Sequence, residues 1–435
     1  METVIYLVGA VLFFAAIMAS IALHEVGHMI PAKLFGVKVT EYFVGFGRTL
    51  WSFRRGETEY GVKSIPLGGY VKLVGMYPPE PRTGRVRANS TSANPLASLI
   101  QAGRDAEWAD IKPEDDGRLF FQKKTWQKLI VMAGGPMMNL LLAFLFLWAV
   151  VGLHGVNRPQ PVVGTVAECV VPASRAETET CRPEDPKTPA LQAGLQPGDR
   201  IVGFNGTTVT DWDQLQTLIR DNLAGRAEIV VERAGERVAL VPVNTALNGV
   251  PDRWDPSKRV EAGFLGVTPT VERVHGGPVM VVNDMINVSG QSLVALAQFP
   301  VKVWNTAVNM ITGQPRDIYG PMSVVGASRA AGEISSTQQL GASDKVAYFF
   351  LLLGNVNLFV ALFNFVPLLP LDGGHILGAI VEGIRRTFAK IFRRPDPGYL
   401  DTAKMLPVAY AVFAFIAVSS VVLIVADLID PVRLF

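Results

Sequence analysis

The sequence predicts a polytopic α-helical membrane protein with four transmembrane helices, an inserted extracytoplasmic α+β domain and a membrane-associated β-hairpin or small sheet. The first observation is composition: the 435 residues are 49% hydrophobic and only 18% charged, which is apolar for a soluble chain of this length. The second is that four stretches of membrane-spanning length lack Asp, Glu, Lys and Arg: Val4–Leu23, Leu129–Leu153, Val346–Leu371 and Met405–Ala426. The net charge of +2 gives no basis for nucleic-acid binding.

Transmembrane helices are therefore expected within 1–30, 126–153, 346–375 and 405–428. The connecting segments 31–125 and 376–404 are rich in Lys and Arg, and short basic loops stay in the cytoplasm. This orientation makes the protein a multi-pass protein of the cell (inner) membrane, with both termini on the extracytoplasmic side. The chain begins Met-Glu-Thr and lacks the basic start of a signal peptide, so the first stretch is expected to be a retained helix.

The run His24-Glu25-Val26-Gly27-His28 closes the first apolar stretch. Residues four apart share a helix face, so His24 and His28 are placed to bind one zinc ion. Glu25 then lies beside the metal, where it can deprotonate a bound water. Ionisable groups in a membrane helix are costly and indicate function, although His24 and His28 could also be buried structural histidines.

Topology gives a second line of support for a zinc site. The first and third helices run in the same direction, so the histidines and Asp372 reach the same depth, near the cytoplasmic face. A catalytic zinc takes three protein ligands and keeps one position open for water. Asp372 is the expected third ligand. The neighbouring His375 is the alternative, and Asp372 could instead be a cap in a Gly-rich turn.

Two motifs together resemble the paired signature of the site-2 protease family, intramembrane zinc metalloproteases of bacterial regulated intramembrane proteolysis. They are the His24–His28 run and Asn364–Gly373, which reads Asn-Phe-Val-Pro-Leu-Leu-Pro-Leu-Asp-Gly. The likeness includes Gly135–Asn139 and covers most of the chain. It implies that one Zn²⁺ is held by His24, His28 and Asp372 rather than His375.

The same resemblance implies that Glu25 is the catalytic base and that Asn364 binds the substrate backbone. It also implies that substrates are single-span membrane proteins already cleaved on the extracytoplasmic side, such as anti-sigma factors or remnant signal peptides. Asn139 and Asn357 are either catalytic groups or helix–helix hydrogen-bonding groups. Pro367 and Pro370 break the third helix. Irregular backbone at membrane depth is tolerated only where it is buried or lines a water-filled cavity, and a hydrolase needs such a cavity for water.

A β-hairpin is expected at about 58–76, between the first two helices, from Glu59–Ile65 and Leu67–Val74. In similar proteases this region dips into the membrane and pairs with the substrate strand. The expected substrate-binding residues here are Gly68, Gly69 and Tyr70, with a plain cytoplasmic hairpin as the alternative. From about 77 to 117 the chain is rich in Pro, Arg, Ser and Ala, and a flexible loop is expected.

The segment after the second helix contains a strand-like run, Val162–Val166, and a segment, Pro189–Ile201, that resembles the PDZ segment of bacterial proteases. We expect a PDZ-like domain at 160–245 that binds peptide termini by strand addition or excludes bulky ectodomains. Cys169 and Cys181 are the only cysteines. Outside the cytoplasm they can form a disulfide, with two unpaired thiols as the alternative.

Residues 246–345 are expected to form amphipathic linker helices on the outer membrane surface. Two rival functions belong to other classes. One is a catalytically silent membrane scaffold that binds peptides, against which Glu25 and the complete ligand set argue. The other is a zinc transporter, against which the lack of further polar ligands along the helices argues.

Overall fold

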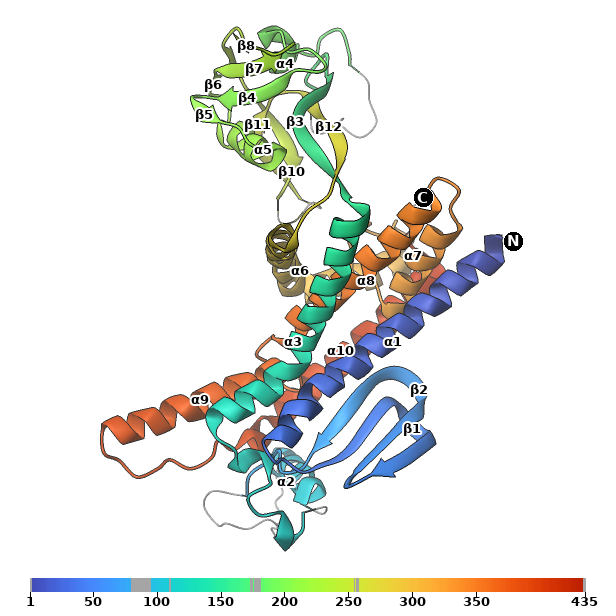
Figure 1. The fold of residues 1–435 in the computed structure, drawn as a ribbon, viewed down its shortest axis with the longest axis vertical. Coiled ribbons are helices and arrows are strands. Elements are labelled where there is room, and N and C mark those ends of the chain that lie inside the picture. The colour runs from blue at the N-terminus through green and yellow to red at the C-terminus, as the bar shows by residue number, and fades with distance from the viewer. Residues whose placement is uncertain are drawn as a thin grey trace. The chain divides into compact units, whose positions relative to one another are not determined.

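The computed structural model describes residues 2–79, 95–108, 111–172, 175, 181–253, 255 and 258–432. The chain divides into two compact units. The first, here called the membrane unit, contains Met1–Val150 and Pro278–Phe435, and the second, the inserted unit, contains Val151–Gly277. Figure 1 shows a helical membrane unit and an inserted unit built mainly of strands.

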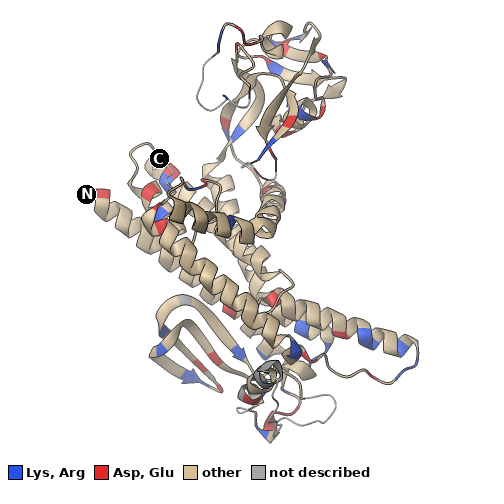
Figure 2. Cartoon of the chain, turned by 180° about the vertical axis from the view of Figure 1, so that it is seen from behind, with Lys and Arg blue, Asp and Glu red and all other residues tan. Residues whose placement is uncertain are grey.

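The membrane unit consists of helices with one β-ribbon. Among the described residues, five helices are long and apolar enough to cross a membrane, and in Figure 2 charged residues are sparse along them. Four of the five correspond to the expected spans, and the fifth is α6. The helices are α1 Glu2–Leu34, α2 Pro95–Trp108, α3 Thr125–Ala149, α6 Pro278–Thr312, α7 Val324–Ser336, α8 Ala342–Asn364, α9 Asp372–Ile391 and α10 Leu406–Ile429.

Helix α1 extends eleven residues beyond its charge-free stretch, from Leu23 to Leu34, so the histidine motif lies inside the helix. Gly36 ends the helical segment with a φ of +68°, a conformation that glycine adopts without steric cost. The buried side of α1 packs with α7 and α8 through a cluster around Phe13, Ile17 and Leu353. This packing fixes the helix whose far end carries the histidines.

The third apolar stretch is divided between two helices, contrary to the single helix expected for 346–375. Helix α8 ends at Asn364, and α9 begins at Asp372. Pro367 and Pro370 cannot donate helical hydrogen bonds, so the chain turns between them. Residues 376–391, expected as part of a basic loop, are helical because their apolar residues recur every three or four positions.

The β-ribbon is larger than the hairpin expected at 58–76. Strand β1 (Val39–Arg55) pairs antiparallel with β2 (Thr58–Leu73). The ribbon folds back on itself, so that residues 39–44 lie between residues 69–73 and residues 59–62. The expected pairing of 59–65 with 67–74 is therefore wrong, because the aromatic and β-branched residues of β1, which favour strands, supply the partner for both.

The segment expected to be a flexible loop at 77–117 contains helix α2. The Arg104 guanidinium of this helix lies 2.8 Å from Asp401 Oδ1, and both side chains are buried. Residues 80–94 and 109–110 of that loop lie outside the described residues. The ion pair fixes α2 to the connection between α9 and α10.

The inserted unit is an α+β fold around one core that includes Ile201, Phe204 and Leu215. Its main sheet has the order β12-β3-β4-β7-β8, with β5 paired to β4. The elements are β3 Val156–Val166, α4 Pro189–Ala193, β4 Arg200–Phe204, β5 Thr207–Thr208, α5 Trp212–Asp221, β6 Arg226–Ala227, β7 Ile229–Arg233, β8 Glu236–Ala239, β9 Val243–Asn244, β10 Ala246–Pro251, β11 Arg259–Phe264 and β12 Val267–Val274.

The inserted unit extends beyond the limits 160–245. Residues 246–274, expected to begin the linker helices, form β10, β11 and β12 instead. The physical reason is that β12 pairs with β3 at the sheet edge and the adjoining Leu265 is buried in the core. Cys169 and Cys181 are joined in a disulfide, with their Cα atoms 5.8 Å apart.

Candidate metal centre

Helices α1 and α3 approach closely at two glycines. A Cβ added to Gly134 would lie 2.0 Å from Gly27 O, and one added to Gly27 would lie 2.3 Å from Gly134 O. Only glycine permits this contact between backbones. The contact brings α3 against the face of α1 that carries His24 and His28.

Groups on α3 orient both imidazoles. His24 Nδ1 lies 3.0 Å from Asn139 Oδ1, and His28 Nδ1 lies 2.8 Å from Val131 O. A carbonyl oxygen can only accept, so each Nδ1 donates a hydrogen, and when the ring is neutral its Nε2 presents a lone pair. This is the arrangement by which neighbouring groups commonly fix metal-binding histidines.

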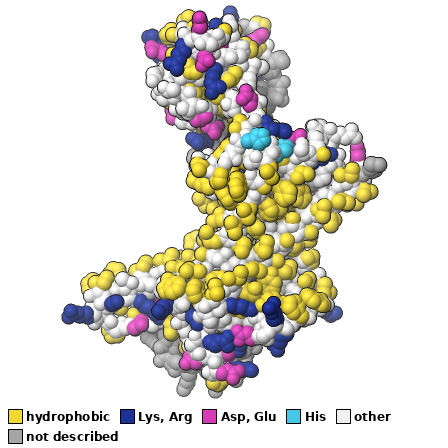
Figure 3. All heavy atoms as spheres, in the orientation of Figure 1, with side chains coloured by type: hydrophobic (Ala, Val, Ile, Leu, Met, Phe, Trp, Pro, Cys, Tyr) yellow, Lys and Arg dark blue, Asp and Glu magenta, His cyan; other side chains and the backbone are white. Residues whose placement is uncertain are grey.

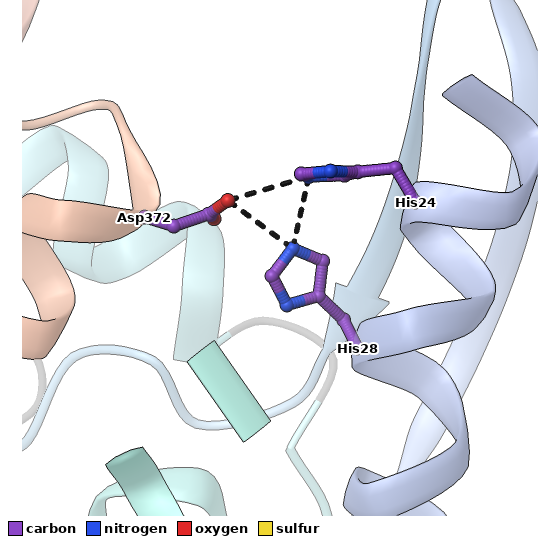
Figure 4. A group of neighbouring side chains, drawn as sticks. All are labelled: His24, His28 and Asp372. Atoms are coloured by element: carbon purple, nitrogen blue, oxygen red, sulfur yellow. Dashed lines mark hydrogen bonds and ion pairs between the residues drawn. The ribbon is translucent and has the colours of Figure 1, made fainter. Parts of the chain in front are cut away.

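The two Nε2 atoms and one oxygen of Asp372 form a compact triangle (Figure 4). The Nε2 atoms are 3.2 Å apart, and Asp372 Oδ2 lies 3.3 Å from each of them. His24 and His28 come from α1, and Asp372 is the first residue of α9. Sequence positions nearly 350 apart thus meet at one point.

This triangle fits a metal ion. Ligand atoms about 2.0–2.1 Å from a tetrahedral zinc lie roughly 3.4 Å apart, close to the three distances observed. Asp372 Oδ2 is buried and has no hydrogen-bond partner among the described residues. A Cβ on Gly135 would lie 2.2 Å from His28 Nε2 and 2.6 Å from His24 Nε2, so glycine leaves open the space that a side chain would fill.

Glu25 lies between the triangle and the β-ribbon. The backbone of Val71 lies close to its carboxylate, and a Cβ on Gly69 would be 3.4 Å from Glu25 Cγ. Residues 69–73 form an outer segment of the ribbon, paired with residues 39–44. The candidate base therefore lies beside an outer strand segment of the ribbon.

The remaining predicted site residues differ in their surroundings. Tyr70 is held in the ribbon, where its hydroxyl donates to Glu41 Oε2 at 2.6 Å and accepts from Lys63 Nζ at 2.7 Å. Gly68 bends the strand with a φ of +94°. Asn364 donates to Val360 O at 3.1 Å within its own helix.

His375 lies outside the triangle. It lines a small cavity with Lys128, Glu382 and Thr402 among other residues. Asn357, weighed beside Asn139, donates to Ser20 Oγ at 3.2 Å and to Leu353 O at 2.8 Å. Asn139 contacts a candidate ligand directly, whereas Asn357 connects α8 to α1.

A buried ion pair between α3 and α9 was missed in the sequence. Lys128 Nζ lies 2.8 and 3.0 Å from the two oxygens of Glu382, and both side chains are at most 6% exposed. The pair connects the helix that orients the histidines to the helix that carries Asp372. The only signal in the sequence was one glutamate at a buried position of an amphipathic helix.

A His-Glu-x-x-His helix, completed by an aspartate from a second helix within a unit of apolar helices, defines a metallopeptidase embedded in the membrane. Comparison of the sequence with family models agrees with this class, since residues 12–393 match Peptidase family M50. The chain therefore belongs to Peptidase family M50, the site-2 protease family.

Relatives are similar over almost the whole chain. The zinc metalloprotease Rip1 of Mycobacterium tuberculosis is 34% identical over 441 residues, covering 99% of both chains. The protein of the same name from Mycolicibacterium smegmatis is 34% identical over 443 residues, covering 98% of this chain and 99% of its own. A putative zinc metalloprotease of Brucella suis is 25% identical and covers 87% of each chain.

Proposed function

We propose that this zinc metalloendopeptidase hydrolyses peptide bonds within the transmembrane segments of single-span membrane proteins, using His24, His28 and Asp372 as ligands and Glu25 as base. The observation that carries the proposal is that the Nε2 atoms of both histidines and one Asp372 oxygen lie within 3.3 Å of one another. Glu25, the residue after His24, lies beside an outer strand segment of the β-ribbon. The multi-pass character of the chain, with five helices of spanning length and composition among the described residues, supports action on membrane-protein substrates within the bilayer.

The metal-binding residues and the base have distinct roles in this mechanism. A zinc ion bound by the three ligands supplies Lewis acidity, which polarises the scissile carbonyl and makes water acidic enough to ionise near neutral pH. Glu25 accepts the proton of the attacking water and transfers it to the leaving amine. Hydrogen bonds to Asn139 and the Val131 carbonyl would hold both imidazoles with their Nε2 atoms toward the ion.

Substrate presentation is proposed to occur at residues 69–73, an outer segment of the ribbon that has no second strand partner among the described residues. A helical peptide bond has its carbonyl occupied by a hydrogen bond and must unwind before hydrolysis. Strand addition beside Gly69 and Val71 would replace those helical hydrogen bonds with new ones, next to Glu25. Asn364 is proposed to bind the substrate backbone, by the likeness of its motif to that of the family.

A proline scan of a transmembrane substrate tests this presentation. Alternate residues of a strand direct their N–H groups to the same side. Proline should therefore block cleavage at every second position near the scissile bond and be tolerated between. Uniform sensitivity would argue against strand pairing while leaving the zinc mechanism intact.

Four membrane crossings, by α1, α3, α8 and α10, are proposed, with α6 on the membrane surface. Helix α6 contains Pro300 and is the least apolar of the five candidates, and in Figure 1 it is seen nearly end-on, crosswise to α1 and α3. Arg316, just after α6, pairs with Asp427 near the C-terminal end of α10 at 2.6 Å. These contacts are consistent with α6 lying on the membrane surface. The chain after α6 then reaches the end of α10 that is farthest from the histidines.

The active site is then near the cytoplasmic face of the inner membrane, with both termini outside. Single cysteines test this orientation, since Cys169 and Cys181 are already paired. Arg55→Cys should react with an impermeant maleimide only in inverted vesicles, and Glu236→Cys only in intact cells. The reverse pattern would invert the topology.

The inserted unit is proposed to be a PDZ-like domain that captures peptide termini. A groove of about 200 Å³ runs between α5, at Trp212 and Ile219, and residues 263–267. Strand β12 begins the sheet order, so a peptide could add to that edge. Peptide-binding measurements with a Gln216→Trp variant, which narrows the groove, test capture against exclusion of bulky ectodomains.

Pathway and substrates are tested together by membrane proteomics. Cells with the Glu25→Gln protein should accumulate membrane-bound fragments already trimmed on the extracytoplasmic side, such as anti-sigma factors or remnant signal peptides. Identical fragment profiles in cells with wild-type and Glu25→Gln protein would contradict the proposed role.

A further inference from the structure

Helix α9 carries a continuous apolar stripe that no described part of the protein covers. The stripe consists of six large side chains that are 37–67% exposed: Leu377, Ile380, Val381, Ile384, Phe388 and Ile391. Their spacing of three or four residues puts them on one side of the helix. In Figure 3, which has the orientation of Figure 1, α9 projects to the lower left. Apolar side chains cover its upper edge, and Lys and Arg gather at its outer end.

The opposite side of α9 packs on the protein. Gly378, Ala379 and Glu382 are buried, and Glu382 pairs with Lys128 of α3. At about 100° per residue, these positions lie roughly opposite Ile384. The apolar stripe therefore points away from the unit that α9 is attached to.

Basic residues flank the stripe and follow it. On the same helical projection, Arg385 lies about 100° to one side of Ile384 and Lys390 about 120° to the other. Arg393 and Arg394 come directly after the helix and are exposed. The only acidic residues of α9 are Asp372, in the metal site, and Glu382, in the buried pair, so the exposed surface of the helix is positively charged.

We propose that α9 lies in the plane of the membrane interface and binds a leaflet rich in anionic lipid. The stripe enters the acyl chains, and Arg385, Lys390, Arg393 and Arg394 contact the lipid phosphates. An apolar face with Lys and Arg at its borders is the pattern of an interfacial helix. Its basic residues exclude a spanning role, and exposure to water would leave a large apolar patch without a partner.

Lipid binding by α9 would also affect the metal centre, if the proposed function holds. Asp372 opens α9, so the position of a metal ligand depends on what holds the helix. The Lys128–Glu382 pair holds its inner side, and lipid holds its outer side. Anionic lipid should therefore strengthen zinc retention as well as bind the helix.

Spin labelling of the full-length protein tests the in-plane position. Phe388→Cys, in the stripe, and Lys390→Cys, at its border, are matched single-thiol variants because the native cysteines are paired. In vesicles containing phosphatidylglycerol, the label at 388 should collide mainly with oxygen and the label at 390 mainly with a water-soluble nickel chelate. Labels at Leu377 and Ile384 should report the same depth as the label at 388.

Three outcomes would overturn the proposal. Water accessibility at 388 would show that the stripe is outside the membrane. Depth that increases steadily from 377 to 388 would show a spanning or steeply tilted helix. Spin–spin broadening between labels at 388 would show that a second copy of the chain covers the stripe.

Lipid retention tests the charge component. Arg393→Gln with Arg394→Gln should reduce co-purified phosphatidylglycerol about tenfold or more, as expected for two basic residues near an anionic surface. The control, Arg226→Gln with Arg237→Gln, makes the same charge change in the inserted unit and should leave lipid retention unchanged. Equal loss in both variants, or in neither, would contradict the proposal.

Failure of this inference and failure of the proposed function are separable. Lipid binding by α9 is measured without substrate, and cleavage dependent on Glu25 is measured in detergent. If the protein in detergent cleaves substrate in a Glu25-dependent way but α9 binds no lipid, the proposed function stands and the proposed lipid binding is wrong.

Discussion

The two halves of α9 carry carboxylates with opposite surroundings. Glu382 accepts hydrogen bonds from Lys128 Nζ and, at 3.1 Å, from the Leu400 backbone N–H. It also lies 3.5 Å from the Arg386 guanidinium. Asp372, ten residues earlier, faces the Nε2 atoms of two imidazoles. No Lys or Arg among the described residues pairs with it in the structure.

The difference separates a structural carboxylate from a metal ligand. A buried carboxylate surrounded by cationic donors is already neutralised, and removing one partner is destabilising. A buried carboxylate that faces only acceptor atoms needs a bound cation to neutralise its charge. This distinction, rather than burial alone, supports our proposal that Asp372, and not Glu382, is the metal ligand on α9.

The largest expected effect concerns the base beside the triangle. Glu25→Gln should lower cleavage by about 10²–10⁴-fold, the contribution of a positioned general base, and should leave zinc content unchanged because all three ligands remain. Cleavage of a reconstituted transmembrane substrate and metal analysis of the same preparation check both parts. Full cleavage by the variant would remove Glu25 from the mechanism.

The next effect tests the ligand end of α9. Asp372→Ala should weaken zinc binding by more than about 100-fold, which exceeds the loss expected for a neighbouring orienting group. His375→Ala is the matched control on the same helix and should keep its zinc. Competition with a chelator measures both affinities, and loss of zinc only in the His375 variant would reverse the assignment.

The paired end of α9 should show a smaller effect on the same measurement. Glu382→Gln leaves the Lys128 ammonium buried without its counter-charge, and the resulting shift of α9 should weaken zinc binding about 10–100-fold. Replacing both partners, with Lys128→Met and Glu382→Leu, should recover most of the affinity since apolar pairs replace buried ion pairs well. Unchanged affinity in Glu382→Gln would show that the pair does not position Asp372.

The smallest effect comes from a paired carboxylate in the inserted unit. Burial disfavours the charged form of Asp199, but hydrogen bonds from Arg233 and the Gln196 backbone hold the pKa of Asp199 below its ordinary value. A carboxyl whose folded pKa is lowered stabilises the fold above its unfolded pKa, about 3.9. That contribution is lost as the pH falls through the folded value.

Arg233→Leu should therefore destabilise the inserted unit by about 1–2 kcal/mol at neutral pH, and the difference from wild type should vanish in strong acid. Hydrogen exchange of the β4 and β7 amides in the full-length protein measures it across pH. Arg237→Leu, an exposed position on the adjacent strand, is the control. A difference that stays constant with pH would exclude the Asp199 charge as its source.

The sequence predicted that His24, His28 and Asp372 lie together, because the signals for this grouping are local or topological. The four-residue spacing of His24 and His28 required only helical geometry, and the charge pattern of the loops brought Asp372 to the same depth. The triangle found in the structure agrees with that expectation. The identity of the ion and the role of each residue stay predictions.

Other features depend on contacts that a single sequence does not reveal. The Lys128–Glu382 pair joins positions 254 apart, and the space at Gly135 exists only once α1 and α3 cross. The partner of β2 was missed because alternation was sought within 58–76 alone. Helix α9 was taken for a loop because its basic residues obscured an apolar period of three to four.

Anomalous diffraction at the zinc absorption edge tests the central claim most directly. Crystals of the Glu25→Gln protein, which keeps every ligand and avoids turnover, should give a single anomalous peak in contact with His24 Nε2, His28 Nε2 and an oxygen of Asp372. A peak on His375, or a zinc-loaded protein whose peak lies away from these three residues, would contradict the account.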